Sequence, residues 1–153
     1  GATLKRMSEE VRDGHLTGVD YSATSLELSG KTNAEALQQG KMDLVEASVE
    51  KLPFADNAFD KIITVESFYF WPDPQENLKE VRRGLKEGGT FLLVADTYNK
   101  EGLDPKTLEN ICRFHLFTPT AEEFRKLFEK AGFTGIQIHV KEGTDWICVE
   151  GKK

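Results

Sequence analysis

The sequence predicts an α/β fold: a doubly wound, mostly parallel sheet with helices on both faces and an antiparallel C-terminal hairpin. Short apolar runs typical of strands alternate with amphipathic segments typical of helices through most of the chain, and this alternation favours a parallel sheet covered by helices. The last two apolar runs lie too close together for a parallel crossover, so we expect them to form the hairpin. The chain has 153 residues, and we expect residues 1–153 to form a single domain.

Six segments carry the apolar and β-branched residues that strands favour. The segment DKIITVE, residues 60–66, predicts a strand buried on both faces, and TFLLVAD, residues 90–96, has the clearest strand pattern. In chain order, the expected strands are 15–21, 42–48, 60–66, 90–96, 136–140 and 146–150.

Helices are predicted from apolar residues at helical spacing and from residues that start or stop a helix. Ser22 is the expected N-cap of the second helix. The segment Pro72-Asp73-Pro74 opens the third helix, which Gly88 and Gly89 break. In chain order, the expected helices are 2–13, about 23–38, the segment between Pro74 and Gly88, 105–113, and a helix from Thr118 or Thr120 to Gly132.

Composition excludes several classes of protein. The 20 basic and 26 acidic residues give a net charge of −6, which argues against a nucleic-acid binder with a broad basic surface. No apolar stretch approaches the ~20 residues of a membrane span, and no signal-peptide pattern is visible, so we expect a cytoplasmic protein. Cys112 and Cys148 belong to no CxxC pair or Cys/His cluster, so we expect reduced, buried thiols and no metal site.

Candidate ligand-binding residues follow the predicted strands, because doubly wound sheets bind ligands beyond the carboxyl ends of their strands. Asp20 follows the first strand, and its carboxylate can either accept both hydroxyl protons of a ribose or cap the next helix. Position alone favours neither role. After the second strand, Ser48 and Val49 offer a hydrogen bond and an apolar contact to an adenine ring, although an ordinary surface loop has the same pattern.

Four consecutive aromatic residues, Phe68 to Trp71, follow the strand expected at 60–66. A solvated loop gains nothing from such a run, so we expect some of these rings to join the core and at least one to line a substrate pocket. Among the three histidines, only His115 lies near a loop that is expected to face a ligand. No nucleophile–base pair stands out, and the catalytic residues stay unassigned.

Three segments together resemble the class I S-adenosylmethionine-dependent methyltransferases, in particular the branches called type 11 and type 25. They are LPFADNAFDKIITVESFYFW, LKEVRRGLKEGGTFLLVAD and FTPTAEEFRKLFEKAGF, with GVDYS before them in the expected order. The resemblance covers nearly the whole chain. It implies a Rossmann-like fold and an enzyme that uses S-adenosylmethionine to methylate a small molecule, which the aromatic run suggests is lipophilic.

The resemblance also implies roles for individual residues. Asp20 would hold the ribose hydroxyls of the cofactor, and Tyr21 would pack on its adenine. Ser48 stands where the family often has an aspartate that reads the adenine amino group. The expected cofactor-binding residues are Gly1, Asp20, Tyr21, Ser48, Val49, Thr64 and Glu66, and the expected substrate-pocket residues are Phe68, Tyr69, Trp71 and His115. Because the sulfonium of the cofactor is already activated, such an enzyme needs no catalytic triad.

The sequence departs from the family at its start. The family begins with a central strand and a glycine-rich turn, D-x-G-x-G-x-G, and Gly1 resembles the last glycine of that turn. The first strand, which in the family lies between the strands ending at Asp20 and Glu66, is not in the sequence. We therefore expect two unpaired strand edges and weak cofactor binding by this stretch alone. The two strands could close up, another chain could pair with an edge in self-association, or a preceding segment could belong to the intact protein.

Two other functions stay open at this point. A nicotinamide-dependent oxidoreductase shares the architecture and also reads a ribose with an acidic residue, but no tyrosine here has the lysine four positions on that the short-chain type uses. The second alternative is a truncated relative that keeps the fold and binds the cofactor, or only a partner, without turnover.

Overall fold

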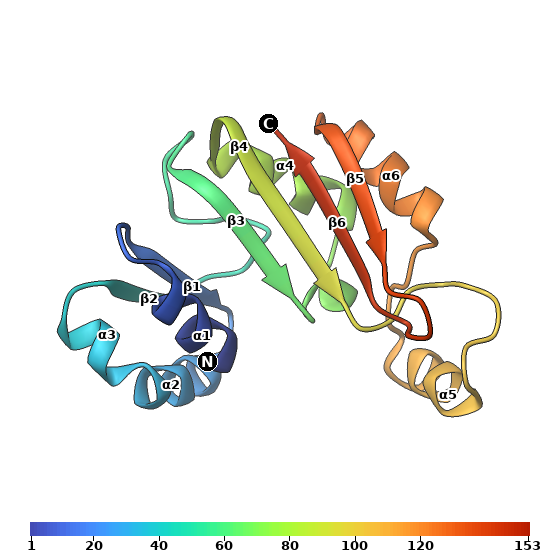
Figure 1. The fold of residues 1–153 in the computed structure, drawn as a ribbon, viewed down its shortest axis with the longest axis horizontal. Helices are drawn as coiled ribbons and strands as arrows, with labels where there is room; N and C mark the ends of the chain where they lie inside the picture. The colour runs from blue at the N-terminus through green and yellow to red at the C-terminus, as the bar shows by residue number, and fades with distance from the viewer. The chain divides into compact units, whose positions relative to one another are not determined.

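The computed structural model of the protein describes all residues from 1 to 153. The chain divides into two compact units, residues 1–51 and 52–153, and each unit has a sheet of its own (Figure 1). The expectation of a single domain stays a prediction. None of the helices is both long enough and apolar enough to span a lipid bilayer.

The first unit contains a two-stranded parallel sheet and three helices. Its elements, in order, are α1 (Ala2–Glu10), β1 (Leu16–Asp20), α2 (Ala23–Thr32), α3 (Ala34–Gln38) and β2 (Met42–Glu46). Both expected strands are confirmed. The helix expected at 23–38 is interrupted at Asn33, whose buried side-chain amide donates to the Ser29 carbonyl (2.9 Å) and to the Gly1 carbonyl (3.1 Å). The first helix ends earlier than expected because Val11 is extended.

Gly18 in β1 allows α1 to pack directly on the sheet. A Cβ atom at this position would overlap with the Leu4 side chain of α1 and would lie 2.8 Å from Cδ2 of Leu44 in β2. Gly18 is opposite Leu44 in the parallel register. The absence of a side chain at position 18 therefore makes room for two leucines that cover this face of the strand pair.

The second unit contains a four-stranded sheet in the order β3-β4-β6-β5. Its elements are β3 (Phe59–Val65), the 3₁₀ helix η1 (Phe68–Phe70), α4 (Pro74–Gly84), β4 (Leu85–Ala95), α5 (Pro105–Phe114), α6 (Ala121–Lys130), β5 (Thr134–Val140) and β6 (Ile147–Lys152). β3 and β4 are parallel. β6 runs antiparallel to both β4 and β5, which confirms the expected C-terminal hairpin.

The helix starts follow their capping residues. Asp73 accepts a hydrogen bond from the backbone of α4, and Asp104 does so for α5. Of the two threonines considered for the last helix, Thr120 is the N-cap, and it forms a capping box with Glu123. Gly88 and Gly89 were expected to end the helix before the strand, and they do not. The strand already begins at Leu85 and carries both glycines at an irregularity opposite Phe59 to Lys61.

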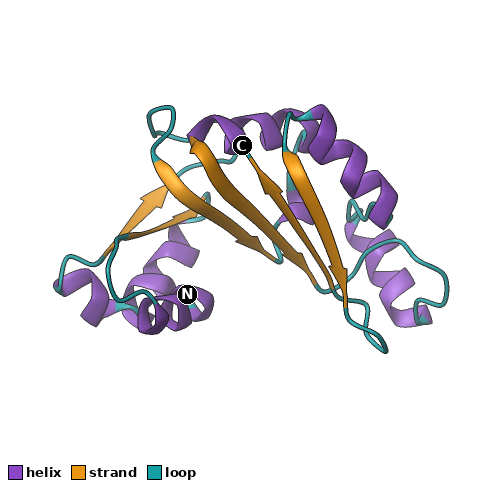
Figure 2. Ribbon diagram, turned by 45° about the horizontal axis from the view of Figure 1, so that its top comes forward, coloured by secondary structure: helices purple, strands orange, loops and turns teal.

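The core of the second unit lies between the sheet and two helices. α4 and α6 contact each other and cover the same face of the sheet (Figures 1 and 2). Phe91 of β4 is fully buried there and its ring stacks with those of Phe128, Phe133 and Trp71. Gly151 of β6 leaves space for these rings, because a Cβ atom there would lie 2.9 Å from Phe128.

β3 is less buried than the sequence predicted. The Ile63 side chain is 38% exposed, and Ile63 pairs with Leu92, one residue out of phase with the buried Phe91 and Leu93. It therefore lies on the face that α4 and α6 do not cover. β3 is also an edge strand, since β4 is its only neighbour. The cysteines differ from expectation as well. Both are free, but Cys148 is only half-buried, and Cys112 is exposed because α5 buries none of its residues.

Arg83 of α4 fixes the loop that precedes β3. Its guanidinium donates to the carbonyls of Phe54 (2.8 Å) and Leu52 (3.2 Å) and to the carboxylate of Asp56 (2.8 Å). It also makes two 2.8 Å hydrogen bonds to Glu80 one turn earlier in the helix. One side chain thus satisfies the backbone of a segment that forms neither helix nor strand.

Replacing the central core ring tests this packing. We expect Phe91→Ala to lower the free energy of unfolding by roughly 3–5 kcal/mol, because it leaves a cavity among three rings. Phe70→Ala is the control, since its ring is 61% exposed, and should change stability by no more than about 0.5 kcal/mol. Urea unfolding followed by circular dichroism measures both, and equal losses would contradict this account of the core.

Candidate functional site

The carboxyl end of β1 presents the Asp20 carboxylate in a defined turn. Asp20 Oδ1 accepts a hydrogen bond from the backbone N–H of Ser22 (2.9 Å). Ser22 itself is the N-cap of α2, and its hydroxyl accepts from the N–H of Ser25. The capping role considered for Asp20 therefore belongs to Ser22. The second oxygen, Oδ2, has no partner in the structure and remains able to accept a hydrogen bond.

The end of β2 lies beside this turn because the two strands are parallel. Asp20 is opposite Glu46, and the N–H of Ala47 donates to the Asp20 carbonyl (3.0 Å). The next residues form a tight turn, in which the Ser48 hydroxyl donates to Glu50 Oε2 (2.9 Å) and accepts from the Glu50 N–H (3.2 Å). The Ser48 hydroxyl is thus already engaged, which weakens its case as the group that reads an adenine.

Three further residues of the first unit were expected at a cofactor. The Tyr21 ring follows Asp20 directly and is 76% exposed, so its face is free for packing. Val49 lies half-buried in the turn after β2. Gly1 is elsewhere: a Cβ atom on it would lie 3.0 Å from Ser29, in the second half of α2, whereas Asp20 lies at the start of that helix. The structure brings Asp20, Tyr21, Ser48 and Val49 together and does not add Gly1 to them.

The second unit has a polar cluster at the carboxyl ends of β3 and β4. Glu66 directly follows β3 and Asp96 directly follows β4. The strands are parallel neighbours, and the N–H of Glu66 donates to the Val94 carbonyl (3.0 Å). Glu66 adopts the left-handed conformation, with φ +55°, which is uncommon for a residue with a side chain. Two residues before Glu66, the Thr64 hydroxyl is hydrogen-bonded to that of Ser67.

Tyr69 joins the two carboxyl groups. Its hydroxyl donates to Asp96 Oδ1 (2.9 Å) and lies 3.3 Å from Glu66 Oε2. The N–H of Thr97 donates to the same hydroxyl oxygen (3.2 Å). The Tyr69 side chain is only 7% exposed, so its ring is fixed by the core while its hydroxyl reaches the cluster. Glu66 and Tyr69, assigned to different parts of a site from the sequence, are in direct contact.

Burial and like charge shape the electrostatics of this cluster. Burial raises the pKa of Glu66 from its ordinary value of 4.5 to about 7, and the neighbouring Asp96 carboxyl adds to the shift. The pKa of Tyr69 is also raised, mainly by burial, so its hydroxyl stays protonated and acts as a donor. Two acidic side chains so close together favour a state in which one of them keeps its proton near neutral pH.

The aromatic run divides between core and surface. Phe68 is 1% exposed and packs against Trp71, Phe117 and Phe124. Trp71 is half-buried, and Phe70 is the exposed member of the run. The rings of Phe68 and Trp71 therefore serve the core in this structure, and their contact with a substrate stays a prediction.

His115 lies at the C-terminal end of α5 in the left-handed conformation. Its ring is exposed and has no partner in the structure. The chain then returns to η1, where the N–H of Phe117 donates to the Tyr69 carbonyl (3.3 Å). The role of His115 as a substrate contact also stays a prediction.

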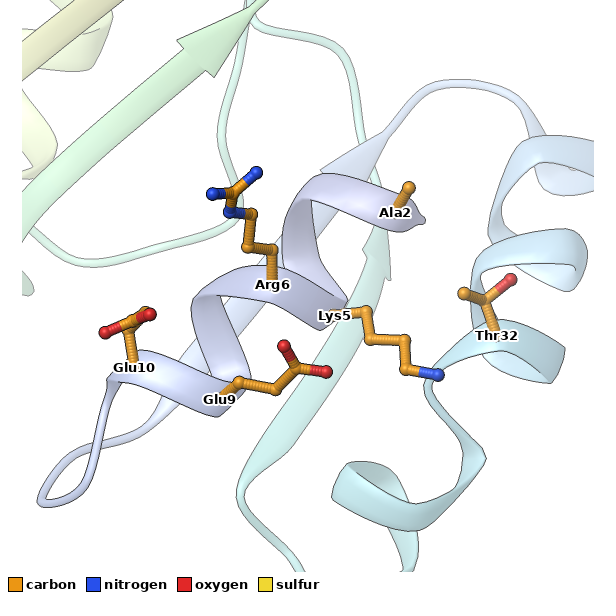
Figure 3. A pocket seen from close by; sticks show the side chains of 6 residues that line it. All are labelled: Ala2, Lys5, Arg6, Glu9, Glu10 and Thr32. Atoms are coloured by element: carbon orange, nitrogen blue, oxygen red, sulfur yellow. The ribbon is translucent and has the colours of Figure 1, made fainter.

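A separate surface pocket lies in the first unit and includes none of the expected site residues. It is formed by α1 and the end of α2 and is lined by Ala2, Lys5, Arg6, Glu9, Glu10 and Thr32 (Figure 3). Lys5 extends toward the helix that carries Thr32, whereas Arg6 points to another side of α1. The open, mixed-charge lining selects no particular ligand.

Sequence reasoning missed Asp96 and Thr97. Asp96 is the last residue of the segment TFLLVAD, and both residues follow β4 in the structure. Inspection of the residues at the end of each strand, the rule that led to Asp20 and Glu66, would have found them. What the sequence could not reveal is the contact through Tyr69, which depends on the turn at Glu66 and on the 3₁₀ helix after it.

Comparison with known proteins identifies the family. Residues 1–93 match a family described as a methyltransferase domain. The chain belongs to this family. The resemblance to class I S-adenosylmethionine-dependent methyltransferases is thereby confirmed, and the chain shares the Rossmann-like α/β fold of such enzymes.

Relatives of the domain include enzymes with named acceptors. A rice 2-methyl-6-phytyl-1,4-hydroquinone methyltransferase is 28% identical over 146 residues, which cover 95% of this chain and 42% of the rice protein. An uncharacterized methyltransferase of Bacillus subtilis is 26% identical, covering 92% of this chain and 70% of that one. The methyltransferase domain spans less than half the length of the rice relatives that it matches.

Solved structures share the fold of the domain. Phosphoethanolamine N-methyltransferase 2 of Haemonchus contortus, in complex with S-adenosyl-L-methionine, superposes with a TM-score of 0.85 at 14% identity, covering all of this chain and 46% of the nematode enzyme. A SAM-dependent methyltransferase of Thermotoga maritima gives a TM-score of 0.66 at 20% identity and covers 98% and 87% of the two chains.

The raised pKa of Glu66 makes the stability of the domain depend on pH. In the unfolded chain Glu66 ionises near its ordinary pKa of 4.5, and in the folded domain near about 7. Its contribution to stability is therefore present below the lower value and lost as pH rises through the higher one. We expect Glu66→Gln, which cannot ionise, to gain on the order of 1 kcal/mol relative to the wild type between about pH 5 and about pH 8.

Urea unfolding at a series of pH values measures this difference. Glu129→Gln in α6 is the matched control, because Glu129 is exposed and lies outside the cluster, and it should follow the wild type throughout. A constant difference between Glu66→Gln and the wild type at every pH would contradict the raised pKa.

Proposed function

We propose that this domain transfers a methyl group from S-adenosylmethionine to a small, lipophilic acceptor that carries hydroxyl groups, such as a hydroquinone. The observation that carries the proposal is the Asp20 carboxylate at the end of β1, which keeps one oxygen unpartnered beside the exposed Tyr21 ring. The named acceptors of the rice relatives support the substrate class.

The residues of the first unit fit the adenosine part of the cofactor. Asp20 Oδ2 is available for a ribose hydroxyl, since only Oδ1 is used by the turn. The Tyr21 ring is available for an adenine face. Val49 follows the neighbouring parallel strand and would add an apolar contact. The roles of Thr64 and Glu66 at the methionine part of the cofactor stay predictions from the resemblance.

When bound, the cofactor supplies a sulfonium whose methyl group is already activated for transfer. The work left to the protein is to bind the adenosine, to orient the acceptor and to keep water away. The exposed Phe70 ring and the half-buried Trp71 ring provide apolar surface in the segment that also carries Tyr69 of the Glu66 cluster. An acceptor with an aromatic head and hydroxyl groups matches both features.

We also propose a class of substrate, a mode of self-association and a cellular compartment for the protein. The net charge of −6 supports a small-molecule substrate over a nucleic acid. β1 and β3 each have a single neighbour in their sheets, and these free edges are the surfaces through which we propose self-association. Two free cysteines support a reducing compartment such as the cytoplasm.

Ligand-induced thermal stabilisation tests the cofactor site. We expect S-adenosylhomocysteine to raise the melting temperature of the domain in proportion to its occupancy, and NAD to leave it unchanged. Asp20→Asn should weaken S-adenosylhomocysteine binding by about 10- to 100-fold, because it removes a charged acceptor. The asparagine side chain can still accept from the Ser22 N–H, so the turn is retained.

Asp43→Asn is the matched control, since Asp43 is an exposed aspartate on β2 whose partner is His15. This variant should bind S-adenosylhomocysteine as the wild type does. Stabilisation by NAD instead would support the oxidoreductase, and equal binding by Asp20→Asn and the wild type would remove Asp20 from the site. Binding of S-adenosylhomocysteine without transfer to any acceptor would favour the relative that lacks turnover.

A further inference from the structure

We propose that Asp96 is the group that accepts the proton of the methyl acceptor, and that Glu66 and Tyr69 position it. The proposal rests on the methyl-transfer function inferred above and deepens it, because it requires an acceptor with an O–H group. Asp96 has no role in any assignment made from the sequence.

The two carboxyl groups share a single side-chain hydrogen-bond donor, Tyr69. Tyr69 has one hydroxyl proton, and it points to Asp96 (2.9 Å) more closely than to Glu66 (3.3 Å). No cation balances the pair: neither carboxyl group forms an ion pair, and Lys100, the nearest lysine along the chain after Asp96, is bound to Asp145 at 2.7 Å. Two adjacent carboxyl groups with no cation are best satisfied when they share a proton.

Buried polar atoms that lack a hydrogen-bond partner gather at this cluster. Three side-chain atoms of the protein are in this condition, and two of them are at the cluster: Glu66 Oε1 and the hydroxyl of Thr97. Thr97 is only 7% exposed, and its own N–H donates to Tyr69. Native proteins rarely leave such atoms unsatisfied, so their concentration here indicates that a polar group from outside the chain completes the cluster.

Exposure separates the roles of the two acids. Glu66 is half-buried and Tyr69 is buried, whereas Asp96 is exposed. A substrate hydroxyl can therefore reach Asp96. Burial favours the protonated form of Glu66, as the raised pKa indicates, so the exposed Asp96 is the member of the pair that is placed to accept a proton from a substrate. The Tyr69 hydrogen bond holds the Asp96 carboxylate in one orientation.

Methyl transfer to an acceptor with an O–H group would break the S–CH3 bond of the bound cofactor, whose electron pair would go to sulfur, and would form a bond between the acceptor oxygen and the methyl group. The acceptor releases one proton in this exchange. The O–H bond of the acceptor breaks, its electron pair stays on the acceptor oxygen, and the proton forms a new O–H bond with the Asp96 carboxylate. Because Asp96 is exposed, the proton then passes to solvent and the carboxylate is restored without any further reactant.

The test uses the full chain with three variants, Asp96→Asn, Glu66→Gln and Tyr69→Phe, and Glu129→Gln as the control. Carbon-13 NMR of the side-chain carboxyl groups gives their titration, calorimetry gives S-adenosylhomocysteine binding, and radiolabelled S-adenosylmethionine gives methyl transfer to 2-methyl-6-phytyl-1,4-hydroquinone across a pH series. Thermal unfolding confirms that each variant is folded.

We expect Asp96→Asn to lower methyl transfer roughly 100-fold or more at saturating cofactor while S-adenosylhomocysteine binding stays the same. Glu66→Gln and Tyr69→Phe should move the pH dependence of transfer, an effect that a purely structural role would not produce. In the titration, Glu66 should keep its proton to near neutral pH in the wild type, and Asp96→Asn should lower its pKa.

Different results would overturn the proposed function and the inference about Asp96. If the wild type binds no S-adenosylhomocysteine, the proposed function fails. If it binds but both carboxyl groups ionise below about pH 5, or Asp96→Asn transfers methyl groups with the wild-type pH profile, the inference about Asp96 is wrong. Binding without transfer to the hydroquinone favours the relative that lacks turnover, so the proton-accepting role of Asp96 is then wrong while the cofactor site stands.

Discussion

The parallel pairing of β3 with β4 is the constraint on which the polar cluster depends. Parallel neighbours end at the same edge of a sheet, so the residues after them are brought together whatever their separation in the sequence. Glu66 and Asp96 are 30 positions apart and become neighbours only through this register, in which Val65 is opposite Val94. β1 and β2 do the same for Asp20 and Ser48 in the first unit. In each unit, the candidate site thus lies at the carboxyl ends of one pair of parallel strands.

Local signals predicted most of the fold. Ser22 and Thr120 are hydrogen-bonding caps whose effect is confined to one turn, and both helices begin where these residues indicate. The C-terminal hairpin followed from the short connection between its strands. The features that were predicted wrongly depend on contacts between residues far apart in the sequence. Asn33 interrupts a helix by bonding to Gly1, and Ile63 is half-exposed because α4 and α6 cover the opposite face.

The candidate site was predictable to a similar extent. The position of Asp20 after a strand was enough to propose it, and the free oxygen was then found in the structure. The role of Tyr69 was not accessible in this way. Its neighbours in the aromatic run pack into the core, and only the left-handed turn at Glu66 followed by the 3₁₀ helix directs its hydroxyl to Asp96. A hydrogen bond that depends on such a turn has no signature in composition or spacing.

The guanidinium of Arg83 helps to protect the loop before β3 from proteases. The loop that precedes β3 is exposed and has no regular structure, which is the usual target of proteolytic nicking. Arg83 binds the Leu52 and Phe54 carbonyls and thereby holds this backbone against α4, so the loop cannot extend into a protease cleft while these bonds persist. The N–H of Leu52 also donates to Glu80 (2.8 Å) and that of Asn57 to the Arg83 carbonyl (3.0 Å), so susceptibility of the loop to cleavage depends on its bonds to α4 rather than on its length or composition.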